Sequence, residues 1–209
     1  MVPEQVDHLW DCCCDHGFLG QELMLRYPDV EVHFVDITPS IIDRLKDRLC
    51  IEMPNGRWQT HCCDAALLPV TDTGDDARHI VMIAGVGGDL MLDIVRSLAR
   101  IFAGRKVQYL LCPVYHTYKL REGLRELGLG LLDERLVTEK GRCYEVISVA
   151  LDGAQDVSAV GSTMWNFDDR EHQSYYQSLV SHYQRVADGG REGAREILQQ
   201  YQSLAAEAI

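Results

Sequence analysis

The sequence predicts an α/β fold in which a seven-stranded, Rossmann-like sheet is followed by a C-terminal helical hairpin. Strand-like and helix-like segments alternate five times within the first 127 residues, which is typical of a parallel sheet with right-handed crossovers. Two further extended segments, 129–137 and 144–151, follow each other around a glycine-containing turn, as in an antiparallel pair. Beyond residue 160, apolar residues recur at helical spacing.

The five parallel strands are expected where short apolar or alternating runs end near a turn residue. These runs cover residues 9–14, 30–36, 57–63, 79–84 and 107–112. Helices are expected over residues 18–26, 39–49, 90–102 and 119–127, where apolar residues recur every three or four positions. Pro39 lies near the first turn of the second helix, and Gly128 closes the last one.

The chain divides into a sheet domain (1–152), a linker (153–162) and a helical hairpin (163–209). The linker is poor in large apolar residues, and Asp188-Gly189-Gly190 separates two amphipathic segments of similar length. We expect the apolar stripe of the hairpin to pack against the sheet domain or against a second copy of the chain. A homodimer through these helices is therefore one expectation. RNA contact is less favoured, because residues 160–209 carry a net charge of −3.

Composition indicates a soluble globular protein. The 209 residues are 46% hydrophobic and 25% charged, and no segment approaches the roughly 18 consecutive apolar residues of a membrane span. Residues 1–8 have neither the basic region nor the apolar stretch of a secretory leader. Five of the eight cysteines stand in clusters of adjacent residues, so we expect reduced thiols and a cytoplasmic location.

The formal charge of −12 is unevenly distributed, with 17 acids against 7 bases over residues 1–99. A nucleic-acid binder normally presents a basic face. The local candidate comprises Arg100, Arg105, Lys106, Lys119, Arg121 and Arg125. These residues fit a phosphate-contacting patch or ordinary solvated surfaces. The charge balance argues mildly against a polyanionic substrate without excluding one.

The predicted ligand site lies beyond the carboxyl ends of the strands, as in other open α/β sheets. Asp36 ends the second strand, where a carboxylate can accept both hydroxyls of a ribose, and Asp64 ends the third, where it can accept from an adenine amine. Acids at strand ends are also common caps and turn formers, but the series fits an adenosine-bearing cofactor. The predicted cofactor residues are Asp11, Cys12, Cys13, Gly17, Asp36, Ile37, Cys63, Asp64, Ala65, Ala84 and Gly85.

The first strand leads into the stretch HLWDCCCDHGFLG, which discriminates between cofactors. A dinucleotide fingerprint needs three glycines in this turn, but Cys13 and Asp15 are present, with Gly17 as the one glycine. A pyrophosphate is disfavoured beside Asp15, whereas the sulfonium and ammonium of S-adenosylmethionine tolerate acids. The turn therefore favours S-adenosylmethionine over NAD.

Three motifs resemble the bacterial tRNA adenine-N1-methyltransferases that modify adenine 22, a family of class I methyltransferases. The stretch 11–19 is similar to that family's D-I-G-S/T-D-H-A/G-Y-L, and residues 83–88 are similar to I-A-G-M-G-G. Residues 139–145 resemble E-x-G-K/R-x-Y-E. The resemblance covers residues 8–150, with the motifs in the family's order, and the family also carries a C-terminal helical segment.

The resemblance implies methyl transfer from S-adenosylmethionine to N1 of an adenine in tRNA. Asp15 and His16 are the candidate catalytic residues, because either can accept an N6 proton or orient the base. Helix-start hydrogen bonding is an equal alternative for His16. The candidate substrate residues are Gly87, Pro113, Tyr115 and His116, the last two as stacking groups or simple surface residues.

Three features depart from the family. Cys13 replaces its motif glycine, Cys112-Pro113-Val114 replaces Q-P-N, and the chain begins almost at its first strand, either truncated or with a more open site. Two alternatives therefore stay open: a methyltransferase for a small molecule or protein, and a non-catalytic relative. We expect no metal centre, because the cysteines and His61 lack a recognised zinc spacing. The thiols fit a sheet core better.

Overall fold

The computed structural model describes residues 1–3, 5–70, 73–74 and 76–207, the last three of these as backbone alone. Residues 208–209 of the predicted hairpin segment lie outside it. The strands are β1 (His8–Cys12), β2 (Glu31–Asp36), β3 (Trp58–Cys62), β4 (Arg78–Ala84), β5 (Lys106–Cys112), β6 (Gly130–Glu139) and β7 (Arg142–Ala150). The helices are α1 (Phe18–Arg26), α2 (Pro39–Glu52), the short 3₁₀ helix η1 (Ala65–Leu67), α3 (Gly88–Ile101), α4 (Thr117–Glu126), α5 (Arg170–Asp188) and α6 (Ala194–Glu207).

The sheet has seven strands in the order β3-β2-β1-β4-β5-β7-β6. β1 to β5 pair in parallel, and β7 inserts antiparallel between β5 and β6. This arrangement confirms the predicted Rossmann-like sheet with a terminal antiparallel pair. The first strand ends at Cys12 rather than at residue 14, because Cys13 adopts a left-handed backbone conformation with φ 59°, which cannot continue a strand.

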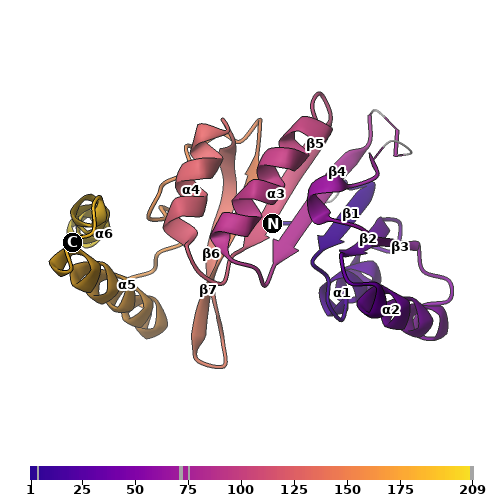
Figure 1. Ribbon diagram of the computed structural model, residues 1–209, viewed down its shortest axis with the longest axis horizontal. Coiled ribbons are helices and arrows are strands. Elements are labelled where there is room, and N and C mark those ends of the chain that lie inside the picture. Colours follow the sequence, from indigo (N-terminus) through magenta and orange to yellow (C-terminus); the bar gives the residue numbers. More distant parts are fainter. Residues whose placement is uncertain (4, 71–72, 75, 208–209) are drawn as a thin grey trace.

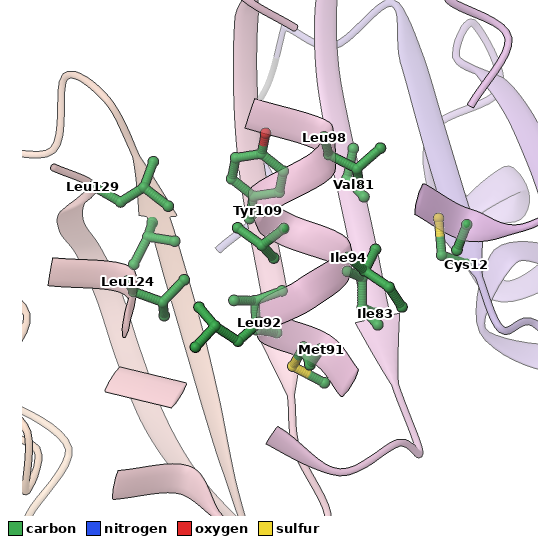
Figure 2. Close-up of a cluster of buried hydrophobic side chains, with 14 of the residues drawn as sticks. Cys12, Val81, Ile83, Met91, Leu92, Ile94, Leu98, Tyr109, Leu124 and Leu129 are labelled. Carbon is green, nitrogen blue, oxygen red and sulfur yellow. The ribbon is translucent and has the colours of Figure 1, made fainter. Parts of the chain in front are cut away.

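Helices cover both faces of the sheet, and the alternation of side chains along each strand supplies both cores. Leu9, Val32 and Phe34 pack with the buried faces of α1 and α2. Trp10 and Cys12 point to the opposite face, which is covered over β4 and β5 by α3. Figure 2 shows the side chains of α3 lying over those of β4. Both faces are therefore buried, as is usual for a parallel sheet.

Helices α5 and α6 pack against each other at one end of the molecule, beyond the β6–β7 pair (Figure 1). Their apolar stripes meet Tyr118 of α4 and Val160 in one cluster. The predicted packing against the sheet domain is thus present, at the α4 end. The segment 153–162, expected as a linker, is itself packed: Val157 is 1% exposed, and Leu131 N donates to Gln155 O at 2.7 Å.

A buried ionic network fastens this end of the molecule. Arg121 of α4 donates to Glu145 of β7 at 2.8 Å and to Glu134 of β6 at 2.6 Å, and its side chain is 1% exposed. The hydroxyl of Tyr175 on α5 donates to Glu145 at 2.9 Å, and Thr163 N donates to Glu134 at 2.6 Å. One guanidinium therefore joins the sheet, α4 and the start of the hairpin segment.

Candidate functional site

The carboxyl ends of the strands align at one edge of the sheet. Cys12 pairs with Val35 and with Ile83, and Ala84 pairs with Cys112. The strand ends singled out in the sequence therefore lie side by side, at the edge where open α/β sheets bind ligands. The structure brings the predicted cofactor residues together along this edge.

The turn after β1 is tight and partly strained. Cys13 (φ 59°), Asp15 (φ 46°) and Gly17 (φ 65°) all have left-handed backbones, a conformation that costs a non-glycine residue roughly 1–2 kcal/mol. Cys14 N donates to Val35 O at 3.1 Å, and Gly17 N donates to Cys14 O at 2.6 Å. Cys13 thus occupies a position whose conformation suits glycine, which explains why the related motif has glycine there.

Asp11 is buried beneath this turn, with 5% of its surface exposed. Its Oδ2 accepts from Gly20 N of α1 at 3.0 Å, which ties the strand to the helix that follows. Burial raises the pKa of this carboxyl from 3.8 to about 7, and the hydrogen bond from Gly20 only partly offsets that rise. A buried carboxyl with a pKa near neutrality, beneath the turn that the sequence predicts to hold the cofactor, is a candidate functional group.

Asp36 and Asp64 end neighbouring strands and hold their own loops. Oδ1 of Asp36 accepts from Thr38 N at 2.9 Å, and Oδ2 is 3.4 Å from Asp15 N. Asp64 caps η1 by accepting from Ala66 N at 2.9 Å. Each carboxylate has about four acceptor positions, so capping leaves capacity for ligand hydroxyls or amines. Asp36 and Asp64 can therefore cap their own loops and still accept hydrogen bonds from a ligand.

The loops after β4 and β5 contact each other. Val114 N donates to Val86 O at 3.0 Å, and Gly88 N donates to Tyr115 O at 2.9 Å. A Cβ at Gly87 would lie 2.4 Å from the Tyr115 ring, whereas a Cβ at Gly85 would meet no atom within 4 Å. Gly87 and Gly88 therefore leave room for the loop after β5 that carries Tyr115. The space beside Gly85, at the end of β4, stays open to a ligand.

The predicted substrate residues Pro113, Tyr115 and His116 line a cavity of about 750 Å³ that reaches between the sheet domain and the hairpin. His116 and Lys119 both hydrogen-bond to Asp89 in the first turn of α3. Lys119 first, and then His116, lowers the pKa of Asp89 to about 2. The ammonium of Lys119, the imidazole of His116 and the carboxylate of Asp89 thus order the rim of this cavity.

The candidate catalytic pair is solvent-exposed. Nδ1 of His16 lies 2.9 Å from Oδ2 of Asp15, and the two side chains are 65% and 67% exposed. The His16 ring stacks on Phe18, and Arg48 donates to the His16 carbonyl. The pair is thus available to a ligand placed over the turn. The N-cap of α1 is Gly17, without a side-chain cap hydrogen bond, so the helix-start role expected for His16 is not the one its side chain takes.

A rim of exposed apolar side chains marks the same edge. Of the twelve large hydrophobic residues that are exposed in the described part of the chain, seven lie in the loop or the first helical turn that follows one of the strands β1 to β5. They are Phe18, Leu19, Ile37, Leu67, Leu90, Val114 and Tyr115. Such a concentration of exposed apolar surface is typical of an interaction site. Sequence reasoning found Ile37 and Tyr115 and missed the others, although apolar residues in the first turn after a strand are a readable signal.

The cysteines at this edge are components of the core. Cys12 and Cys14 are buried, and Cys13 and Cys63 pack against the core under α3. Burial raises the pKa of the Cys13 thiol to about 11 and also raises that of Cys12. These thiols are therefore protonated at neutral pH, and all eight cysteines are free.

The basic residues from Arg100 to Arg125 do not form one patch. Arg121 is buried in the ionic network and Lys119 is paired with Asp89. Arg105 and Lys106 stand at the amino end of β5, where Arg105 donates to the carbonyls of Val70 and Gly74. The sequence grouped these residues by proximity in the chain, but the fold separates them.

Comparisons with known proteins agree with this architecture. Residues 1–147 match the family described as a methyltransferase domain. The tRNA (adenine(22)-N(1))-methyltransferase of Bacillus subtilis is 33% identical over 84 residues, which is 40% of this chain and 34% of the relative. The match thus spans about a third of that protein's length.

Solved structures share the whole fold. The Mycoplasma capricolum TrmK complex with S-adenosyl-homocysteine superimposes with a TM-score of 0.77 at 14% identity, covering 98% of this chain and 92% of that one. The Bacillus subtilis m1A22 tRNA methyltransferase TrmK gives a TM-score of 0.70 at 19% identity, covering 94% and 88%. With the family match over most of its length and the strand order of its sheet, this chain belongs to the methyltransferase-domain family.

Proposed function

We propose that this chain is an S-adenosylmethionine-dependent methyltransferase that acts on N1 of an adenine in tRNA. The observation that carries the proposal is the carboxyl edge: buried Asp11 under a strained turn, carboxylates at the ends of β2 and β3, and an apolar rim around them. The names of the matched relatives support the substrate class.

The residues of the edge fit an adenosine-bearing cation. Asp36 would accept the ribose hydroxyls and Asp64 the adenine amine, with the exposed side chain of Ile37 against the ring. Asp11 and the turn after β1 would hold the methionine end of the cofactor. Its ammonium group is attracted to carboxylates, so the acids near this turn would stabilise it. When bound, S-adenosylmethionine supplies a methyl carbon open to direct displacement.

On the acceptor side, the chain's task is to position the base and exclude water. Tyr115 and His116 would stack on or border the adenine, and Gly87 and Pro113 set the position of their loop. N1 attacks through its own lone pair, so no residue has to remove a proton beforehand. Asp15 or His16 would then accept the proton that leaves N6.

Titration calorimetry with S-adenosylmethionine and with NAD tests the cofactor. Heat is expected with the former alone, and D36A should weaken its binding at least tenfold, about 1.4 kcal/mol. D43A, which removes an exposed carboxylate on α2, is the matched control and should bind S-adenosylmethionine as the wild type does. Unchanged affinity in D36A would show that Asp36 does not bind the ribose. Absence of binding heat with S-adenosylmethionine would refute the proposal.

Methyl transfer to bulk tRNA followed by nucleoside analysis tests the acceptor. 1-Methyladenosine is the expected product. Its absence, with cofactor binding intact, would redirect the assignment to a small-molecule or protein acceptor.

We further infer a cytoplasmic enzyme, supported by eight free thiols. Among the described residues, the helices are all too short or too polar to span a bilayer. Assembly into a homodimer through α5 and α6 stays a prediction, which light scattering on the purified chain would check.

A further inference from the structure

A cluster of imidazoles lies on one face of the sheet, away from the strand ends that carry the proposed reaction. His8 begins β1 and Glu31 begins β2, and His8 pairs with Glu31 on one side and His79 on the other. His33 pairs with Trp10. Because side chains alternate along strands, His8, Trp10 and His33 share a face. Nothing in the methyl transfer uses this cluster.

Three potential ligand atoms converge there. Nδ1 of His8 lies 3.0 Å from Nε2 of His33 and 3.7 Å from Oε2 of Glu31. All three atoms lie within 4.8 Å of one another. Tetrahedral zinc, with bonds of about 2.0–2.1 Å, places its ligand atoms roughly 3.3–3.4 Å apart. The separations from His8 to His33 and to Glu31 bracket that spacing, and the third pair lies within 4.8 Å, so modest side-chain movements suffice to enclose an ion.

The neighbours orient each ligand. The His33 ring stacks on Trp10, with centroids 3.9 Å apart, and its other nitrogen, Nδ1, lies 3.0 Å from Nε2 of His61. Gln59 donates to Oε1 of Glu31 at 2.7 Å, which leaves Oε2 directed at His8. Outer partners of this kind fix the ring tautomer and carboxylate orientation in metal sites.

We propose that His8, Glu31 and His33 bind one divalent cation of the zinc class, with water completing its coordination. Two imidazoles and one carboxylate are a ligand set that suits Zn²⁺. Solvent reaches the edge of the site, because the side chains of His8 and Glu31 are partly exposed, at 14% and 24%. On binding, the hydrogen of His33 occupies Nδ1 and points to His61, so that Nε2 is free to bind the metal.

The ion would cross-link β1 and β2 at their amino ends. It replaces a hydrogen bond between two histidines with bonds from both to one cation. The site therefore adds stability to the sheet at the edge opposite the methyl-transfer site, and its loss should leave cofactor binding in place.

Co²⁺ is the probe, since its visible absorption reports the ligand set. The parent protein for the experiment is this chain with the substitutions C50S and C62S. They remove the two exposed thiols, which would otherwise compete for the metal. We expect one equivalent of Co²⁺, visible bands without thiolate charge-transfer absorption, and displacement by Zn²⁺. E31Q and H8Q should each weaken binding about tenfold or more. H182Q, which alters an exposed histidine on α5, is the matched control and should bind normally.

Thermal melting separates loss of the site from loss of the fold. Zn²⁺ should raise the melting temperature of the parent and of H182Q but leave that of E31Q unchanged, while all three melt alike in chelator. The proposal is overturned by no binding at millimolar Co²⁺, by a thiolate band in the bound state, or by equal affinity in the parent, E31Q and H8Q.

Discussion

Replacing Asp11 with asparagine should stabilise the unliganded protein at alkaline pH. The carboxyl is 5% exposed, and within the described part of the chain its hydrogen-bond partner is Gly20 N at 3.0 Å. An asparagine oxygen can accept the same hydrogen bond, and asparagine has nearly the same volume. D11N therefore removes the charge while keeping the brace between β1 and α1.

The magnitude follows from the pKa of Asp11, which burial raises from 3.8 to about 7. Below pH 4 this carboxyl is protonated in both the folded and the unfolded chain and adds no penalty. Between pH 4 and 7 the unfolded chain ionises first, so the free energy of unfolding falls as the pH rises. Above pH 7 the loss is complete, at about 4 kcal/mol for an interval of about 3 pH units.

Urea denaturation of wild type and D11N at pH 4.5, 6 and 8 measures this difference. We expect D11N to be more stable at pH 8 by up to about 4 kcal/mol, with the gap shrinking toward pH 4.5. D43N, on the surface of α2, should stay within about 0.5 kcal/mol of wild type at each pH. A D11N protein that is less stable at pH 8, or a gap that does not change with pH, would refute the reasoning.

Four further substitutions probe the turn after β1, the loops after β4 and β5, and the buried ionic network. C13G should raise the free energy of unfolding by up to about 1 kcal/mol, because glycine relieves roughly 1–2 kcal/mol of left-handed strain and returns part of it as chain entropy; a loss of stability on urea denaturation would contradict this. G88A should lower the free energy of unfolding by about 1–3 kcal/mol, since its Cβ would lie 2.5 Å from the backbone oxygen of His116. G87A should cost less, because its Cβ meets the exposed and movable ring of Tyr115. Equal losses of stability by thermal melting would count against this difference. R121M should cost about 3–5 kcal/mol by leaving two buried carboxylates unpaired, and a variant as stable as wild type would show that the network is dispensable.

The regular part of the fold was predictable because local periodicity and sheet geometry agree. Every strand from β1 to β7 coincides with a run of alternating or apolar residues. Pro39 begins α2, and Gly128 follows the end of α4, as the sequence predicted. The burial of segment 153–162 was not predictable, because it depends on residues distant in the chain, among them Leu131 and Glu134 of β6. Composition shows where large apolar residues are scarce, but not which segment packs against them.

The site was predictable to the extent that strand ends define it. Asp11, Asp36 and Asp64 all lie at the carboxyl edge as expected, yet the sequence did not show that each also braces a turn. The grouping of His8 with His33 was not visible either. Residues 25 positions apart meet only because β1 and β2 pair in one register, and no sequence spacing records that.

The turn after β1 combines features that stability alone would remove. Asparagine would serve Gly20 as well as Asp11 does without the cost of a buried charge, and glycine would fit the backbone of Cys13 without strain. Ionised carboxylates beneath a turn become favourable when a cation binds against them, because the cation offsets the desolvation that raised the pKa. Unfavourable terms concentrated at one strand end, next to an exposed apolar rim, are what a binding site for a cationic nucleoside requires. We therefore infer that the carboxyl of Asp11 serves the proposed ligand rather than the fold.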